Sequence, residues 1–288
     1  MINMLKTTFF KYHAIGNDYI VLDPKTFSLT LTRNIIQMLC HRNFGIGGNG
    51  ILYGPIHYEN NLCLKIYNPN GSEAENSGNG VRIFALYLLQ QNYIANDLFN
   101  INTKSGTIKI NILNRKKKII RTYLELFSFA SNLIPTLFKQ KIALNIKLNI
   151  DGYKGIIHCV NVGNPHCVLI KDNISKNMIE KLGPIFESHN NFPNAINVQI
   201  MQIIDWKTIK IEIWERGVGY TLSSGTSSMA TFCVAYKLGL VGEEVRVIMA
   251  GGSVLVKMEK GDKISLVGTA SLIGKGQLSD EFISQHLK

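Results

Sequence analysis

Two short turns of small residues, 76–80 (NSGNG) and 223–227 (SSGTS), hold the side chains best placed to do chemistry. Each turn leads into an apolar run with helical periodicity, and each carries a serine, Ser77 in the first and Ser224 in the second. A helix N-terminus presents N–H groups and the positive end of the helix dipole, so each turn is suited to binding an anion. The serines lie about half the chain apart, which predicts a duplicated unit. Two such turns facing each other would hold a carboxylate from both sides.

Composition and length favour a globular protein of two domains. The chain has 288 residues, of which 45% are hydrophobic and 18% charged. Charged residues interrupt the first 23 positions, and no stretch approaches the roughly 18 apolar residues that span a membrane. We therefore expect a soluble, cytoplasmic protein. Its five cysteines are scattered without a C-x-x-C pair, which favours reduced thiols over disulfides or a structural zinc site.

The net charge of +11 raises the question of nucleic-acid binding. The basic residues are spread along the chain, however, apart from one run at 115–118 (RKKK). That run separates two strand-like segments and is most simply a hairpin turn. We therefore expect a solvated basic surface and no nucleic-acid partner.

Most of the chain has the patterns of short strands. Alternating or β-branched apolar residues occur at 7–11, 19–22, 62–67, 108–112, 156–162, 168–170, 198–204, 208–214, 245–249, 254–258 and 264–267. Helical periodicity occurs at 32–40, 81–91, 175–182 and 226–238. This mixed order predicts an α+β fold, with a domain boundary near 115–135. Thr30 or Thr32 is expected to cap the first helix, and Gly239 to end the last long one.

Polar residues gather where several of these strands end, beside the two anion-binding turns. Each cluster alone is typical of an ordinary turn. Together, asparagine amides and a neighbouring Glu–Arg pair could bind amino and carboxylate groups at once. The candidates are Asn17, Asn68, Asn164, Asn197, Glu215 and Arg216.

These segments together resemble the diaminopimelate epimerase family over nearly the whole chain. The matching segments are 11–18, 45–47, 68–80, 163–167, 197–202, 215–226 and 251–253. The resemblance implies a PLP-independent enzyme that inverts one α-carbon of a diamino dicarboxylic acid, with no cofactor and no metal. It also implies an α+β fold of two pseudo-symmetric domains, each a central helix wrapped by a mostly antiparallel sheet, with the active site in the cleft between them. The expected domains are 1–122, joined by the returning segment from about 268 to 288, and 123–267.

The resemblance also assigns roles to individual residues. The non-reacting end of the substrate would be bound chiefly by Asn17, Asn68, Asn164, Asn197, Glu215 and Arg216. The reacting α-carboxylate would be held at the two helix starts by Gly78, Asn79, Gly225 and Thr226. The expected ligand is a small amino acid like diaminopimelate. A homodimer is compatible with the sequence, and no membrane partner is expected.

The departure from the family lies in the catalytic residues. The family uses two cysteines, one in each half, as base and acid, and this chain has Ser77 and Ser224 at those positions. A thiol titrates near ~8.5 and lower at a helix N-terminus, whereas a serine hydroxyl needs a neighbouring base. His166 is one candidate, but the family has a histidine there too, which favours a role in holding the turn. Tyr220 also replaces a glutamate that is frequent in the family.

Three interpretations follow from the serines. The chain is a family isomerase whose turnover is impaired by loss of the cysteines, a serine-type member acting on a different amino acid, or a non-catalytic amino-acid binding protein. We expect an epimerase of the diaminopimelate type, with Ser77 and Ser224 in the positions of acid and base.

Overall fold

The computed structural model describes residues 5–58, 61–75, 77–124, 127–150, 153–261 and 263–286. Asn76, the first residue of the 76–80 turn, therefore lies outside the described residues. The chain forms two compact units. The first unit comprises Met1–Thr122 with Thr269–Lys288, and the second comprises Tyr123–Gly268.

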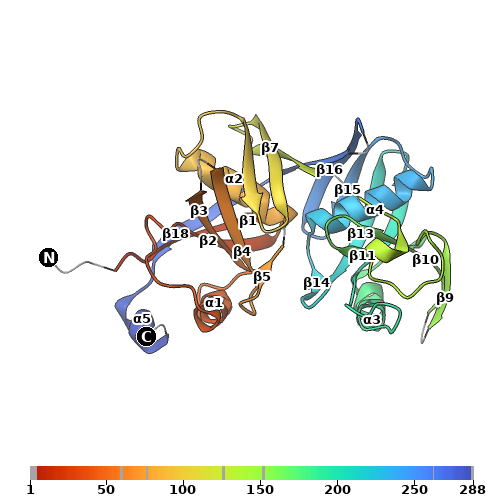
Figure 1. Ribbon diagram of the computed structural model, residues 1–288, viewed down its shortest axis with the longest axis horizontal. Helices are drawn as coiled ribbons and strands as arrows, with labels where there is room; N and C mark the ends of the chain where they lie inside the picture. Colours follow the sequence, from red (N-terminus) through yellow and green to blue (C-terminus); the bar gives the residue numbers. More distant parts are fainter. Residues whose placement is uncertain are drawn as a thin grey trace. The chain divides into compact units, whose positions relative to one another are not determined.

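The first unit is a sheet that surrounds one helix (Figure 1). In chain order its elements are β1 (Thr8–Ala14), β2 (Asn17–Leu22), α1 (Arg33–Cys40), β3 (Ile51–Tyr58), β4 (Asn61–Tyr67), β5 (Glu73–Ala74), α2 (Gly78–Gln90), β6 (Leu98–Thr103), β7 (Gly106–Asn114), β8 (Ile119–Leu124), β18 (Ser271–Gln277) and α5 (Asp280–His286). The strands pair in the order β18-β1-β2-β3-β4-β6-β7-β8. The C-terminal segment thus supplies an antiparallel neighbour to β1.

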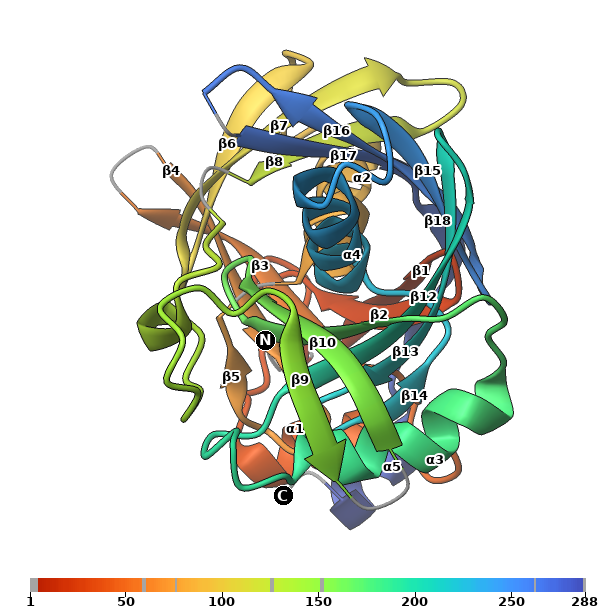
Figure 2. The same cartoon turned by 90° about the vertical axis from the view of Figure 1, so that its right-hand side faces the viewer.

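The second unit has the same plan. Its elements are a 3₁₀ turn (Ser131–Leu133), β9 (Ile146–Ile150), β10 (Tyr153–Asn161), β11 (Pro165–Ile170), α3 (Lys176–Glu187), β12 (Asn197–Asp205), β13 (Thr208–Glu215), β14 (Gly219–Thr221), α4 (Gly225–Lys237), β15 (Glu244–Met249), β16 (Gly252–Glu259) and β17 (Lys263–Thr269). The strands pair in the order β9-β10-β11-β12-β13-β15-β16-β17. In Figure 2, α4 is seen with β12, β13, β15 and β16 of its own unit around it.

The duplication predicted from the two turns is visible in the connections. In each unit an antiparallel hairpin is followed by an outer helix, a second hairpin, the central helix and three more strands. The outer helices α1 and α3 connect the parallel pairs β2–β3 and β11–β12. The central helices α2 and α4 connect the parallel pairs β4–β6 and β13–β15. The remaining pairings within each unit are antiparallel, so the α+β prediction of two related units is confirmed.

The central helices are buried on all sides, as expected for helices that are apolar around their whole circumference. Every residue from Asn79 to Leu88 in α2 is buried, and so is every residue from Gly225 to Ala235 in α4. Each helix begins at a serine cap, and α4 ends where Gly239 adopts a φ of 69°. Leu240 N–H then bonds back to Ala235 O at 2.9 Å. This confirms the predicted stop at Gly239.

Other boundaries were predicted less well. Thr32 does cap α1, and residues 115–118 form the turn between β7 and β8. The helix predicted at 175–182 instead continues to Glu187 through Pro184, because Ile179 and Phe186 on the same helix pack into the core of the second unit. The sequence patterns also missed strand β3. Its internal Gly54–Pro55 pair is typical of a turn, but here it lies at an irregularity in the pairing with β4.

Candidate active site

Ser77 lies at the start of α2, in the first unit. Its Oγ accepts a hydrogen bond from Gly80 N–H at 3.0 Å and so caps the helix. The same Oγ lies 2.9 Å from the phenol oxygen of Tyr19, on β2. The hydroxyl is partly buried and has no carboxylate among its described hydrogen-bond partners. The polar side chain beside Ser77 is therefore the phenol of Tyr19, which can give a proton to the serine oxygen after the serine has donated its own.

Gly78 and Asn79, predicted to hold a carboxylate, are the first two residues of α2. The first N–H groups of a helix have no acceptor within the helix, and they carry the positive end of its dipole. The Asn79 side chain is buried, and its Oδ1 accepts a short hydrogen bond from Arg82. The turn is thus rigid at its polar end.

Asn17 lies at the tip of the β1–β2 hairpin, where it pairs with Ala14 and is 7% exposed. The turn consists of Ile15 and Gly16, both at positive φ (46° and 87°). A β-branched residue rarely adopts this conformation. Gly16 N–H donates to His13 Nδ1 at 3.3 Å, which closes the turn. The tip is therefore strained, and other contacts must hold it.

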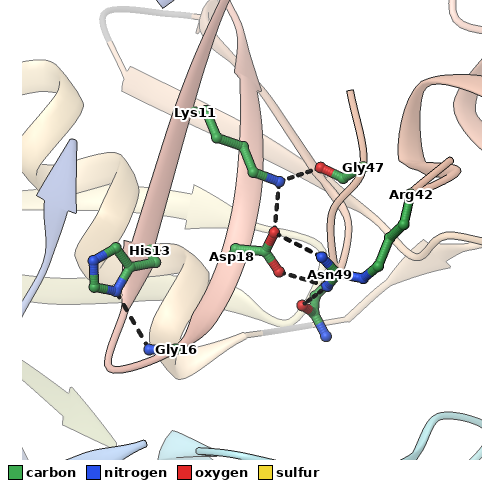
Figure 3. A network of polar contacts seen from close by, with 7 residues as sticks. All are labelled: Lys11, His13, Gly16, Asp18, Arg42, Gly47 and Asn49. Atoms are coloured by element: carbon green, nitrogen blue, oxygen red, sulfur yellow. Dashed lines mark hydrogen bonds and ion pairs between the residues drawn. The ribbon is translucent and has the colours of Figure 1, made fainter. Parts of the chain in front are cut away.

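The network in Figure 3 supplies those contacts. Asp18 pairs with Lys11 at 2.6 Å and with both terminal nitrogens of Arg42, at 2.8 and 3.2 Å. Arg42 also donates to Asn49 Oδ1 at 2.8 Å, and Lys11 donates to Gly47 O. Although burial opposes ionisation, these two cations lower the pKa of Asp18. The ionised carboxylate joins the hairpin that carries Asn17 to the loop after α1.

Asn68 follows β4, in the loop that leads to the α2 turn. Its N–H donates to Ser72 O at 2.8 Å, and its side-chain Nδ2 donates to Ser72 Oγ at 3.0 Å. Gly71 in the same loop has a φ of 83°, which a residue with a side chain rarely adopts. Asn68 is partly exposed, so it keeps hydrogen-bonding capacity for a ligand.

Ser224 lies at the start of α4 and is 3% exposed. Its Oγ accepts from Ser227 N–H at 3.3 Å and lies 3.3 Å from Thr226 Oγ1. The Ser224 side chain also lies within hydrogen-bonding reach of the carboxyl group of Glu215, at the end of β13. Thr221 Oγ1 donates to the same carboxyl group at 3.2 Å. Burial raises the pKa of Glu215, and these two hydroxyl groups oppose the shift.

Asn197 joins two loops of the second unit. Its Nδ2 donates to Pro165 O at 2.9 Å, and its Oδ1 accepts from Arg216 N–H at 3.0 Å. The side chain is 6% exposed. Arg216 Nη1 donates to Asn194 O at 3.0 Å, and the residue is exposed. The Asn197 amide therefore links the turn that contains Asn164 to the turn that contains Arg216.

A second chain of contacts runs from Asn164 to the first turn of α4. His166 Nε2 lies 2.8 Å from the Asn164 amide, and Nδ1 lies 3.2 Å from the Gln199 amide. Gln199 Nε2 in turn donates to Ser227 Oγ at 3.0 Å. Complete burial lowers the pKa of His166 to about 3. The ring is therefore neutral and holds the turn, in agreement with the role favoured by the sequence.

The structure connects several of the candidates in the second unit. In the second unit, a hydrogen bond connects Asn197 with Arg216, and the Glu215 carboxyl group lies beside Ser224. The sequence indicated the residue types but not these pairs. Tyr19, Gln199 and Thr221 were missed because each lies in or beside a strand and has the pattern of ordinary strand residues. Their one signal is a polar group at a buried strand position, next to a candidate turn.

The described residues contain no group of three or more His, Cys, Asp and Glu side chains arranged to hold a metal ion. Within the same part of the chain, no helix is long and apolar enough to cross a membrane.

Comparison with known sequences identifies close relatives. The sequence model for diaminopimelate epimerase matches residues 9–125 and 158–273. Diaminopimelate epimerase 2 from a Nostoc species is 40% identical over 277 residues, which is 96% of this chain and 97% of that protein. Diaminopimelate epimerase from Carboxydothermus hydrogenoformans is 31% identical over 272 residues, which is 93% of this chain and 98% of that protein.

Solved structures share the fold at low sequence identity. A probable proline racemase from Agrobacterium radiobacter has a TM-score of 0.71 at 12% identity, over 95% of this chain and 93% of that chain. A hydroxyproline epimerase from Agrobacterium vitis has a TM-score of 0.70 at 13% identity, over 96% of this chain and 94% of that chain. Both support the two-unit architecture described above.

Proposed function

Because this chain belongs to the diaminopimelate epimerase family, we propose that it is a PLP-independent isomerase that inverts the α-carbon of a diaminopimelate-like amino acid by two-base proton transfer. Diaminopimelate epimerases act on a free amino acid of lysine biosynthesis, so the proposed setting is the cytoplasm. In this proposal Ser77 and Ser224 are the two residues that exchange a proton with the α-carbon. Each serine caps the central helix of its own unit, which supports equivalent positions for the two.

The observation that carries the proposal is the position of the Glu215 carboxyl group beside the Ser224 side chain, where Thr221 Oγ1 also donates to it at 3.2 Å. A serine hydroxyl removes a proton only when a neighbouring base accepts its own. Glu215 is such a base. The α-proton passes to the Ser224 oxygen as the Ser224 proton passes to the Glu215 carboxylate, which leaves a carbanion on the substrate. Burial raises the pKa of Glu215 and so brings it closer to a working pH.

The other face of the α-carbon receives its proton from Ser77. The hydroxyl of Tyr19 lies 2.9 Å from the Ser77 oxygen and replaces the proton that Ser77 donates. Tyr19 regains its own proton from solvent, and Glu215 releases the proton that it took up to solvent, so both groups return to their starting states. The helix starts at Gly78, Asn79, Gly225 and Thr226 hold the α-carboxylate and stabilise the negative charge that develops on the carbanion.

The remaining candidates recognise the non-reacting end of the substrate. The exposed guanidinium of Arg216 pairs with a carboxylate. The asparagines Asn17, Asn68, Asn164 and Asn197 supply both donors and acceptors. The hydrogen bonds of Asn197 support this grouping, since they fix the Asn164 and Arg216 turns against each other.

The test is α-proton exchange in D₂O. The protein is incubated with LL- or meso-diaminopimelate, and α-deuterium is followed by NMR. We expect exchange at the α-carbon, and its loss in Glu215→Gln, which keeps the shape of the side chain but removes the base. Arg115→Met, an exposed position on the β7–β8 turn, is the matched control and should leave exchange unchanged.

Two results would point elsewhere. Exchange with another amino acid but not with diaminopimelate would indicate a serine-type family member with a different substrate. Calorimetric binding of diaminopimelate without exchange would indicate an amino-acid binding protein.

A further inference from the structure

Helix α2 is apolar along most of its length but contains one charged residue, Arg82. Arg82 lies in the second turn of the helix, between Val81 and Ile83, and is 0% exposed. Long side chains on a helix lean back toward its N-terminus. The guanidinium accordingly donates through Nη1 to Gly78 O at 3.1 Å and through Nη2 to Asn79 Oδ1. The charge of Arg82 therefore lies at the first turn of α2, the one that follows Ser77.

This guanidinium has no anionic partner among the described residues. The ion pairs found there involve Lys11, Arg42, Arg115 and Lys176. Arg82 Nε is buried and, in the same part of the chain, has no hydrogen-bond partner. Although burial lowers the pKa of Arg82 to about 10, the group stays charged at neutral pH. A buried cation without an anionic partner is unfavourable, and more so at the positive end of a helix dipole.

The equivalent position in the second unit differs. Arg82 is the fifth residue after Ser77, and the fifth residue after Ser224 is Met229, which is 5% exposed. Methionine fills the same place in α4 without a charge. Packing of a central helix in this fold therefore does not require a cation at that position.

We propose that Arg82 is a positioning residue for an anion: its buried guanidinium supplies fixed positive charge to the α2 turn, so that a carboxylate binds more tightly at Ser77 than the helix dipole alone allows. The inference rests on the proposed function in one respect, since it takes that anion to be the α-carboxylate of the amino-acid substrate. A bound carboxylate would neutralise both the guanidinium and the helix N-terminus, which accounts for a charge that the protein alone leaves uncompensated.

The first test needs neither substrate nor turnover. The thiol introduced by Ser77→Cys serves as a probe of local charge, because a nearby cation stabilises the thiolate. Its pKa is measured from the ultraviolet absorbance of the thiolate, with Tyr19 as the titratable group in contact with it. Adding Arg82→Met should raise this pKa by about half a unit or more, that is, lower the thiolate equilibrium constant by about threefold or more.

Matched variants separate charge from structure. Arg115→Met removes an exposed arginine and should leave the pKa of the probe thiol unchanged, whereas Arg82→Lys should keep it near the value with arginine. If Arg82→Met does not fold, Arg82→Gln is used, with the same expected shift. An unchanged thiol pKa in a folded Arg82→Met or Arg82→Gln variant would overturn the proposal.

The second test is calorimetric binding of diaminopimelate. Arg82→Met in the otherwise unaltered chain should weaken binding by about tenfold, while Arg115→Met should not. Equal affinity of the Arg82→Met variant and the unaltered protein would contradict a role in holding the carboxylate. If the unaltered protein binds no diaminopimelate, the proposed substrate is wrong, and the thiol titration alone decides the role of Arg82.

Discussion

Replacing both serines by cysteine should create or greatly increase epimerisation of diaminopimelate. The double variant Ser77→Cys with Ser224→Cys places a thiol at each helix N-terminus. With an ordinary pKa near ~8.5, roughly a quarter of such a thiol is ionised at about pH 8, and a helix dipole increases that fraction. An acid and a base of suitable pKa typically contribute 10²- to 10⁴-fold to a rate, so an increase of at least about 10²-fold is expected.

The same substitutions should reduce stability. Each serine oxygen caps its helix, at 3.0 Å from Gly80 N–H and 3.3 Å from Ser227 N–H, and sulfur accepts such bonds weakly. Loss of one cap costs about 1 kcal/mol, so the double variant should lose about 2 kcal/mol. For a domain of this size that is a fall in Tm of roughly 4–8 °C. The Ser224 change should cost more, because Glu215 also loses a hydroxyl donor.

The assay is α-deuterium incorporation by NMR, with calorimetry to confirm binding and thermal unfolding to confirm the fold. Either single variant should gain much less than the pair, because inversion needs a donor on one face and an acceptor on the other. A folded double variant that binds diaminopimelate and still exchanges no α-proton would show that the serines are not in the positions of acid and base.

Three further results are expected. Because the folded-state pKa of Glu215 is raised, its contribution to stability is present below the unfolded pKa and lost as pH rises through the folded one. The unfolding free energy, measured in urea, should therefore decline less steeply above about pH 4.3 in Glu215→Gln than in the unaltered protein. The same decline in both proteins would contradict the burial of Glu215. Arg216→Ala should weaken diaminopimelate binding by about tenfold, since it removes a charge-assisted pair. Unchanged affinity in calorimetry would show that the substrate carboxylate does not bind Arg216. His166 has a folded-state pKa of about 3, so the unfolded state binds its proton first and stability falls as pH drops below about 6.5. His166→Gln should remove up to about 1.4 kcal/mol of that fall for each pH unit, and equal slopes would show that His166 is not buried as a neutral ring.

The local signals in the sequence predicted much of the fold because they act within a few residues. Thr32 caps α1 through its own side chain, which accepts from Ile35 N–H, and Gly239 adopts the positive φ that ends α4. The end of α3 was predicted wrongly because Gly183–Pro184 is typical of a break. Gly183 instead lies against the Trp214 ring, where a Cβ would come within 2.3 Å of the indole, and this tertiary contact lets the helix pass.

The candidate site was predictable in its residue types but not in its pairs. Glu215 and Ser224 are nine positions apart on a strand and a helix, and only the short strand β14 between them brings their side chains into contact. Arg82 was overlooked for a different reason. A single charge in an apolar helical run is usually solvent-exposed, and only the enclosing sheet shows that this one is buried.

Duplication explains why each turn starts a central helix. Divergence of the neighbouring side chains explains why the two turns differ chemically. Both central helices start at a serine, but Ser224 lies beside a carboxyl group, while Ser77 lies beside a phenol and one turn before a buried guanidinium. A carboxylate is suited to accepting a proton and a phenol to replacing one. A guanidinium favours negative charge close to it, which suits a bound carboxylate at the α2 turn. Two-base inversion needs one acceptor and one donor at a time, and the proposed mechanism assigns the acceptor to the Ser224 turn and the donor to the Ser77 turn. Proton removal from the Ser224 side should therefore be the easier direction.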